Sequence, residues 1–244
     1  MKLSTLSSKL KLLSVNSNAK TIKSSEVYPN TLTAILYLSP HTLGDRGNVC
    51  NFATEGCKAV CLYTSGRGSM NSVQQARKRK TQLFFDNNSE FINQLTYDLN
   101  LFSEYCLENK LEGYIRLNGT SDLDWQKIKL DKTNKKNCFE LFPQLNFYDY
   151  TKDIKRVSNH KNYHLTFSWN ESVTEKQVIT KLKENINVAI VFDSLPNTWK
   201  NITVIDGDLS DLRPKDMKNV IVGLKAKGMA KKVATDFVIK TINI

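Results

Sequence analysis

Residues 145–171 read LNFYDYTKDIKRVSNHKNYHLTFSWNE and contain, twice over, the pattern that decides the fold. In each half a short apolar run, 145–148 or 163–167, ends in a polar cluster, DYTK or SWNE. Short runs rich in aromatic and aliphatic residues that stop at polar clusters are typical of buried β-strands. The stretch therefore predicts two strands of one sheet, joined by a short connection.

The same pattern recurs along the rest of the chain. Further runs with polar endings lie at 32–38, 113–117, 186–192, 202–205 and 220–224, with a weaker run at 237–242. From residue 145 onward the runs begin about 16 to 23 residues apart, which leaves room for only a short helix or turn between them. Residues 72–107 read as helical, and Asn88-Ser89 predicts a break into two helices, with Ser89 capping the second.

Strands that alternate with helical segments favour a parallel sheet. Eight candidate strands in 244 residues predict an α/β fold, a TIM-like (β/α) barrel that is closed or nearly closed and has short connecting helices. An open doubly wound sheet is the alternative, but no Gly-x-Gly-x-x-Gly turn follows the first strand. No shift in composition marks a second domain, so we expect one domain over residues 1–244, with 1–25 as a candidate extension.

The chain carries 35 Lys and Arg residues against 24 Asp and Glu, for a formal net charge of +11. An apolar fraction of 40% supports a sizeable core and excludes disordered and low-complexity classes. Basic residues gather in 1–30, in the run 77–80 and in 213–244, without the interleaved aromatic residues of a base-stacking surface. This charge suits an anionic small molecule and leaves nucleic acid open as a partner without favouring it.

The cysteine spacing is the most specific signal in the sequence. Cys50, Cys57 and Cys61 form a C-x6-C-x3-C pattern directly after the first predicted strand. We find no secretory signal and no apolar run long enough to span a membrane, so we expect a cytoplasmic protein without a membrane partner. In that reducing compartment, clustered cysteines more often bind metal or do redox chemistry than form disulfides.

Thiolates are soft ligands for zinc and for iron–sulfur clusters. A three-cysteine loop at the mouth of a barrel predicts a [4Fe–4S] cluster, with Asp122 or Asp206 on the fourth iron or with that iron left open. His41 lies before Cys50 and would complete a Cys3His zinc site as the alternative. Three buried cysteines without metal are the remaining interpretation.

Polar residues at the strand ends mark the face to inspect, because parallel barrels build their sites at the C-terminal ends of their strands. Glu171 and Asp193 are examples, although such residues also serve simply as helix caps. We expect a pocket for an anionic small molecule beside the cluster, and its predicted lining is Arg67, Arg116, Asn118, Asp122, Asp149, Lys225 and Lys227. The sequence assigns no catalytic residue.

Several stretches resemble the bacteriophage "gene product 88" family of uncharacterised proteins. They are LSPHTLGDRGNVCNFATEGCKAVCLYTSGRG, IRLNGTSDLDW, FYDYTK, NYHLTFSWNE, VIDGDLSDLRP and IVGLKAKG, and they run from about residue 36 to 228. The resemblance implies a phage or prophage origin, and so a phage-infected or prophage-bearing bacterial cell. It supports the cysteine loop as a site and implies no mechanism.

These features together predict an iron–sulfur protein, and the sequence leaves open whether it is an enzyme. Redox or Lewis-acid chemistry on a small molecule would follow from an open iron in the cluster. One alternative is a basic, zinc-binding protein that contacts nucleic acid. The other is a metal-free protein that contacts a host factor.

Overall fold

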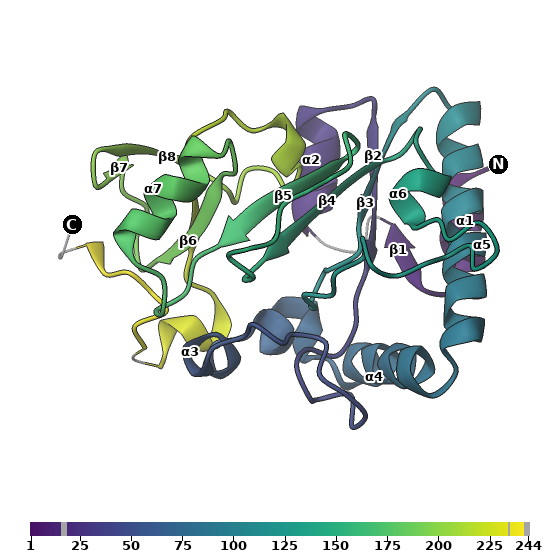
Figure 1. Cartoon of the computed structure of the whole chain (residues 1–244), viewed down its shortest axis with the longest axis horizontal. Coiled ribbons are helices and arrows are strands. Elements are labelled where there is room, and N and C mark those ends of the chain that lie inside the picture. The colour runs from purple at the N-terminus through teal and green to yellow at the C-terminus, as the bar shows by residue number, and fades with distance from the viewer. Residues whose placement is uncertain (16–18, 234, 242–244) are drawn as a thin grey trace.

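The computed structural model describes residues 1–15, 19–233 and 235–241. Within these residues the chain forms a nine-stranded sheet with helices packed around it (Figure 1). The α-helices are α1 (Leu3–Lys9), α2 (Ala19–Val27), α3 (Glu55–Ala59), α4 (Asn71–Asp86), α5 (Asn88–Glu108), α6 (Cys138–Leu141) and α7 (Glu175–Lys183). The strands are β1 (Leu13–Val15), β2 (Thr31–Leu36), β3 (Glu112–Arg116), β4 (Asn146–Thr151), β5 (Tyr163–Ser168), β6 (Val188–Phe192), β7 (Thr198–Trp199), β8 (Ile202–Asp206) and β9 (Ile221–Lys225). Short 3-10 helices are η1 (Leu62–Thr64), η2 (Gly66–Ser69), η3 (Arg213–Lys215) and η4 (Gly228–Lys231).

The strand order is β1-β2-β3-β4-β5-β6-β9-β8-β7. The seven inner strands pair in parallel, and β1 and β7 add an antiparallel strand at either edge. The predicted α/β class and parallel sheet are therefore confirmed. Among the described residues no pairing joins β1 to β7, so the sheet is open and the predicted barrel closure is not seen.

The order of the last strands differs from the sequential order of a barrel. β9 lies between β6 and β8, so that Ile221 pairs with Val188 on one side and with Val204 on the other. Burial gives the reason. Residues 221–223 of β9 are buried, whereas β8 is only partly buried along its length and fits a position near the edge.

Two local predictions need correction. The run 237–242 forms no strand in its described part, because Ile239 makes only one bridge to Phe192, where β5 no longer pairs with β6; residue 242 lies outside the described residues. The helical region does break where predicted, but Asn87 rather than Ser89 caps the second helix by accepting the backbone N–H of Glu90 at 3.2 Å. An Asx cap of this kind serves as well as a serine.

The sheet has two chemically different faces, because side chains alternate along each strand. On one face Ile115, Phe147 and Leu165 pack in the main core with α5. The other face of β3, β4 and β5 is here called the polar face, and its members are Tyr114, Arg116, Tyr148, Tyr150, Lys152, His164, Thr166 and Ser168. Figure 1 shows α7 and α2 on opposite sides of the sheet, and residues 207–216 lie over the polar face through contacts of Asp211.

The N-terminal residues are built into the same core. Leu6 and Leu13 are buried, and β1 extends the sheet beside β2. The buried carboxylate of Asp98 in α5 accepts the backbone N–H groups of Leu12 at 2.7 Å and Leu13 at 2.9 Å. This carboxylate satisfies donors that the entry of the chain into β1 would otherwise leave unpaired.

Candidate cysteine centre

The segment between β2 and α4 carries all three clustered cysteines. It runs below the sheet in Figure 1, beside α4 and the C-terminal residues. Cys57 lies in α3, whose first turn Thr54 caps by accepting the Cys57 N–H at 3.2 Å. The helix α3 ends at Ala59, and Cys61 begins the tighter turn η1.

Residues that follow two different strands hold this segment in place. The Glu171 carboxylate, after β5, accepts the Gly56 N–H and the Thr54 hydroxyl, both at 2.9 Å. After β3, the Asp122 N–H donates to the carbonyl of Val49 at 2.7 Å. The Cys50 thiol donates to the carbonyl of Thr120 at 3.6 Å. The cysteines are thus fixed at the carboxyl edge of the parallel strands, the edge where the sequence predicts the site.

The three thiols share one electrostatic environment. Burial raises the pKa of Cys50 to about 12 and raises the pKa of Cys57 and of Cys61 in the same direction. Negative charge on any one of them would oppose ionisation of the others, since each pair is coupled. As isolated side chains they are therefore protonated thiols, and a cation bound among them would favour the thiolate forms.

In the described part of the chain, no three His, Cys, Asp or Glu side chains converge as ligands of a single metal ion. His41 lies near the segment, its carbonyl accepting the Val49 N–H at 3.2 Å. Its ring contacts the Thr42 hydroxyl at 3.4 Å, and burial lowers its pKa.

Lys152 is the cation that faces the thiols from the end of β4. Its amine donates to the Ser168 hydroxyl at 3.0 Å and to the Trp169 carbonyl at 3.2 Å, and it lies 4.6 Å from the centre of the Phe237 ring. Burial lowers the pKa of Lys152, while the neighbouring Cys57 opposes that shift. The C-terminal residues around Phe237 therefore contact the same amine that neighbours the thiols.

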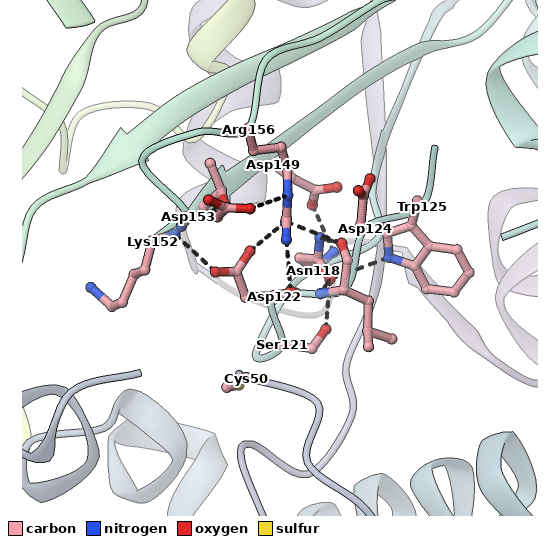
Figure 2. A network of polar contacts seen from close by, with 12 residues as sticks. Cys50, Asn118, Ser121, Asp122, Asp124, Trp125, Asp149, Lys152, Asp153 and Arg156 are labelled. Carbon is pink, nitrogen blue, oxygen red and sulfur yellow. Dashed lines mark hydrogen bonds and ion pairs between the residues drawn. The ribbon is translucent and has the colours of Figure 1, made fainter. Parts of the chain in front are cut away.

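A dense polar network, here called the Asp122 network, stands beside Cys50 (Figure 2). In the described residues its only buried atoms without a hydrogen bond are the Nε of Arg156 and one carboxylate oxygen of Asp124. The Asp122 carboxylate binds the Arg156 guanidinium at 2.6 Å and accepts the Lys152 N–H at 2.8 Å. Next to it, the side-chain oxygen of Asn118 accepts from Ser121 at 2.9 Å and from Trp125 at 3.2 Å. Burial still raises the pKa of Asp122 against the pull of Arg156.

A cavity of about 740 Å³ opens beside this network. The cysteine segment and the connections after β4 and β5 form its walls, which include Phe52, Lys152, Arg156, Asn170 and Gln177. Lys152 borders both this cavity and the thiols, so a molecule in the cavity would lie next to the cysteine centre.

The predicted pocket residues divide between the two faces of the sheet. Asp149 points to the core side, where its carboxylate accepts the Asn118 N–H at 2.6 Å and the Tyr163 hydroxyl at 3.3 Å. Burial raises the pKa of Asp149 to about 7. Arg116 points to the polar face, 3.2 Å from Asp211. These residues therefore do not line one pocket.

The remaining predicted residues lie in other surroundings. The amine of Lys227 and the backbone N–H of Lys225 both bind Asp208, at 2.7 Å and 3.2 Å. Asp206 accepts the backbone N–H of Asp208 at 2.8 Å, and Asp193 is exposed. Arg67 is exposed in η2, downstream of the cysteines.

Sequence reasoning missed Lys152 and Arg77, two of the cations that neighbour the thiols in the described residues. Lys152 was visible as the last residue of the polar ending DYTK, two positions beyond Tyr150 and so on the same face. Arg77 belongs to a basic run, and only its place on α4 shows that it turns inward, toward the rings of Tyr37 and Tyr63. A contact of this kind between distant segments leaves no local pattern in the sequence.

Comparison with known proteins confirms the family resemblance seen in the sequence. No curated protein and no solved structure matches the chain. Among the described residues, no helix has both the length and the apolar character needed to cross a membrane. The family defined as gene product 88 matches residues 9–241, a range that contains the cysteine segment and every strand of the sheet. The chain belongs to the gene product 88 family.

Proposed function

We propose that this protein is an iron–sulfur protein in which Cys50, Cys57 and Cys61 hold a [4Fe–4S] cluster. The observation that carries the proposal is the gathering of three mutually coupled thiols at the carboxyl edge of a parallel sheet. That edge is where parallel α/β folds place their sites. The finer shape, a sheet curved toward a (β/α) barrel with the cluster at its mouth, is part of the same proposal.

The surroundings of the cysteines suit a cluster better than bare thiols. Each cysteine of a [4Fe–4S] cluster binds a different iron, so the three sulfurs need not converge on one point. Three thiolates add negative charge, and the nearby cations Lys152 and Arg77 offset part of it. Partial burial limits solvent access, which is one of the factors that set cluster potentials.

The fourth iron is left for a small molecule in this proposal. Asp122, the first candidate in the sequence, has one oxygen on Arg156 and the other on the Lys152 N–H, so ligation would break contacts already made. Asp206, the last residue of β8, already accepts the backbone N–H of Asp208. When bound, such a cluster supplies either an electron or a Lewis-acidic iron to its ligand.

Anaerobic purification followed by iron and acid-labile sulfide analysis tests the proposal. We expect a coloured protein with about four iron and four sulfide per chain. Cys57→Ala should lose most of this content, whereas the matched control Cys106→Ala should keep it, because Cys106 is a buried core residue in α5. A colourless wild-type protein, or equal iron in the two variants, would refute it.

Two other outcomes separate the alternatives. Stoichiometric zinc without sulfide, together with salt-sensitive DNA or RNA binding, would favour a zinc-stabilised nucleic-acid-binding protein. Full stability and activity after replacement of all three cysteines by Ser would favour a metal-free protein that contacts a host factor.

A further inference from the structure

The polar face holds buried polar atoms that have no hydrogen-bond partner. In the described residues, most side-chain atoms of this kind belong to the polar face and the segments around it, namely Arg77, Arg116, His164, Thr166, Arg213 and Asp216. Native proteins pair almost all buried donors with protein or water, and each exception calls for a physical reason. Asp216 contributes a carboxylate oxygen to this group, but most of the atoms are guanidinium N–H donors. Unpaired donors beside a candidate site suggest a ligand that brings the acceptors.

Arg77 is the clearest member of this group. Thr81, one turn further along α4, accepts the Ser39 N–H at 2.8 Å and so fixes the helix against the end of β2. This anchor places the Arg77 guanidinium 4.8 Å from the Tyr37 ring centre and 5.6 Å from the Tyr63 ring centre. Its Nε and Nη1 atoms are buried without a hydrogen-bond partner in the described residues. The ionisable groups that act on it are Tyr37, Tyr63 and the Cys61 thiol.

Arg116 and Arg213 are the other two arginines with unpaired buried nitrogens in this group, and the three are here called the arginine row. Arg116 lies 4.7 Å from the Tyr150 ring centre, and its Nε is also buried and unpaired. Arg213 is 1% exposed, and its Nε and Nη1 make no hydrogen bond, although Asp216 lies 3.2 Å away. Burial raises the pKa of Tyr150 to about 12, and the positive charges of Arg213 and Arg116 oppose this shift. Positive charge and N–H donors therefore exceed the acceptors present.

We propose that this row binds one small molecule through an oxyanion group, a carboxylate or a phosphate, held chiefly by Arg77 and Arg116. Tyr37 lies near both arginines, since its ring stacks on Arg77 and its hydroxyl acts electrostatically on Arg116. Guanidinium groups held on aromatic rings are well suited to bind carboxylates and phosphates through paired N–H donors.

The position of the arginine row determines which part of the bound molecule lies near the cysteines. Arg77 neighbours Cys61, so an anion on Arg77 leaves the rest of the molecule beside the cysteine centre. Contact between this molecule and an iron–sulfur cluster rests on the proposed function. The binding of the anion itself does not, because every residue of the row belongs to the protein without a cluster.

Titration calorimetry on the full chain tests the inference, with inorganic phosphate and malonate as probes. We expect one saturable site per chain in the wild type. Arg77→Gln should weaken the binding about tenfold or more, as the loss of a charge-assisted hydrogen bond does. The matched control is Arg79→Gln, which removes the same charge from an exposed position of the same helix and should change binding less than twofold. Tighter binding of phosphate assigns a phosphate ligand, and tighter binding of malonate assigns a carboxylate.

The inference is overturned if neither anion saturates a site, or if Arg79→Gln weakens binding as much as Arg77→Gln. Circular dichroism on both variants establishes that each is folded. The same titration on a variant with Ser at positions 50, 57 and 61 separates the two proposals. Retained anion binding there supports this site whatever the metal analysis gives, and loss of binding in that variant alone counts against it.

Discussion

Two polar neighbourhoods lie side by side at the carboxyl edge of the sheet, and they differ in how completely their donors are paired. Around Asn118 and Asp122, one carboxylate and one amide accept from several backbone and side-chain donors at 2.6–3.2 Å. Around Arg77 and Arg116, guanidinium nitrogens are buried against tyrosine rings with acceptors missing. Both neighbourhoods are buried and charged, so burial alone does not separate them.

The difference indicates that the first neighbourhood stabilises the fold and the second binds a ligand. A buried polar network in which most members are paired stabilises one backbone arrangement, here the turn that follows β3. A set of unpaired donors destabilises the free protein and stabilises a complex that supplies the acceptors. We therefore expect substitutions in the first neighbourhood to change stability and substitutions in the second to change binding.

The largest effect should come from breaking the Asp122 network at its ion pair. Arg156 and Asp122 have side chains only 4% and 9% exposed. Arg156→Leu leaves the Asp122 carboxylate buried without its cation, which should lower the free energy of unfolding by about 3–5 kcal/mol. Urea denaturation measures this change.

A second substitution checks the cause of that loss. Asp122→Asn in the Arg156→Leu background removes the unpaired charge while keeping an acceptor for the Lys152 N–H, so it should restore a large part of the stability. If the double variant is as unstable as Arg156→Leu alone, the loss comes from packing and the comparison above fails at this site.

The sequence was most informative where local pattern determines structure. The repeated apolar runs located the seven parallel strands, because burial on both faces produces runs that stand out from the polar connections. It placed the cysteine segment at the right edge of the sheet for the same reason, since that segment directly follows β2. The polar endings also marked Asn118, Asp122 and Glu171, all of which lie around the cysteine segment.

The remainder depended on contacts that no local pattern records. The insertion of β9 between β6 and β8 is decided by burial in the whole sheet. Asp149 and Arg116 were predicted to share a pocket, yet they stand at positions of opposite parity on neighbouring strands and point to opposite faces. Charge alone could not show that Arg77 turns inward while Arg79 is exposed.

An intermediate effect concerns pH, because burial strongly opposes ionisation of Asp149 beside the Asp122 network. The pKa of Asp149 is raised to about 7 in the folded chain, against about 3.9 for an unfolded aspartate. Its stabilising contribution is complete below the unfolded pKa and is lost as pH rises through the folded pKa. Asp149→Asn removes this titration while keeping an oxygen for the Asn118 N–H.

We therefore expect the stability of Asp149→Asn relative to the wild type to rise between about pH 4 and pH 7 and to level off above it. Thermal or urea unfolding of both proteins across that range gives the comparison. Parallel profiles would mean that Asp149 is ionised throughout, and that the network pairs its charge as fully as that of Asp122.

The smallest change in stability should come from the unpaired neighbourhood. Arg77→Met replaces a buried guanidinium that lacks acceptors by an apolar side chain of similar reach. The removed donors each cost about 1–3 kcal/mol, and the lost cation–π contacts with Tyr37 and Tyr63 offset a similar amount. The free energy of unfolding should thus stay within about 1 kcal/mol of the wild-type value, close to that of the control Arg79→Met. A loss approaching that of Arg156→Leu would show that Arg77 is a structural residue. Without a ligand, replacing a guanidinium lowers stability only if its contacts already stabilise the free protein.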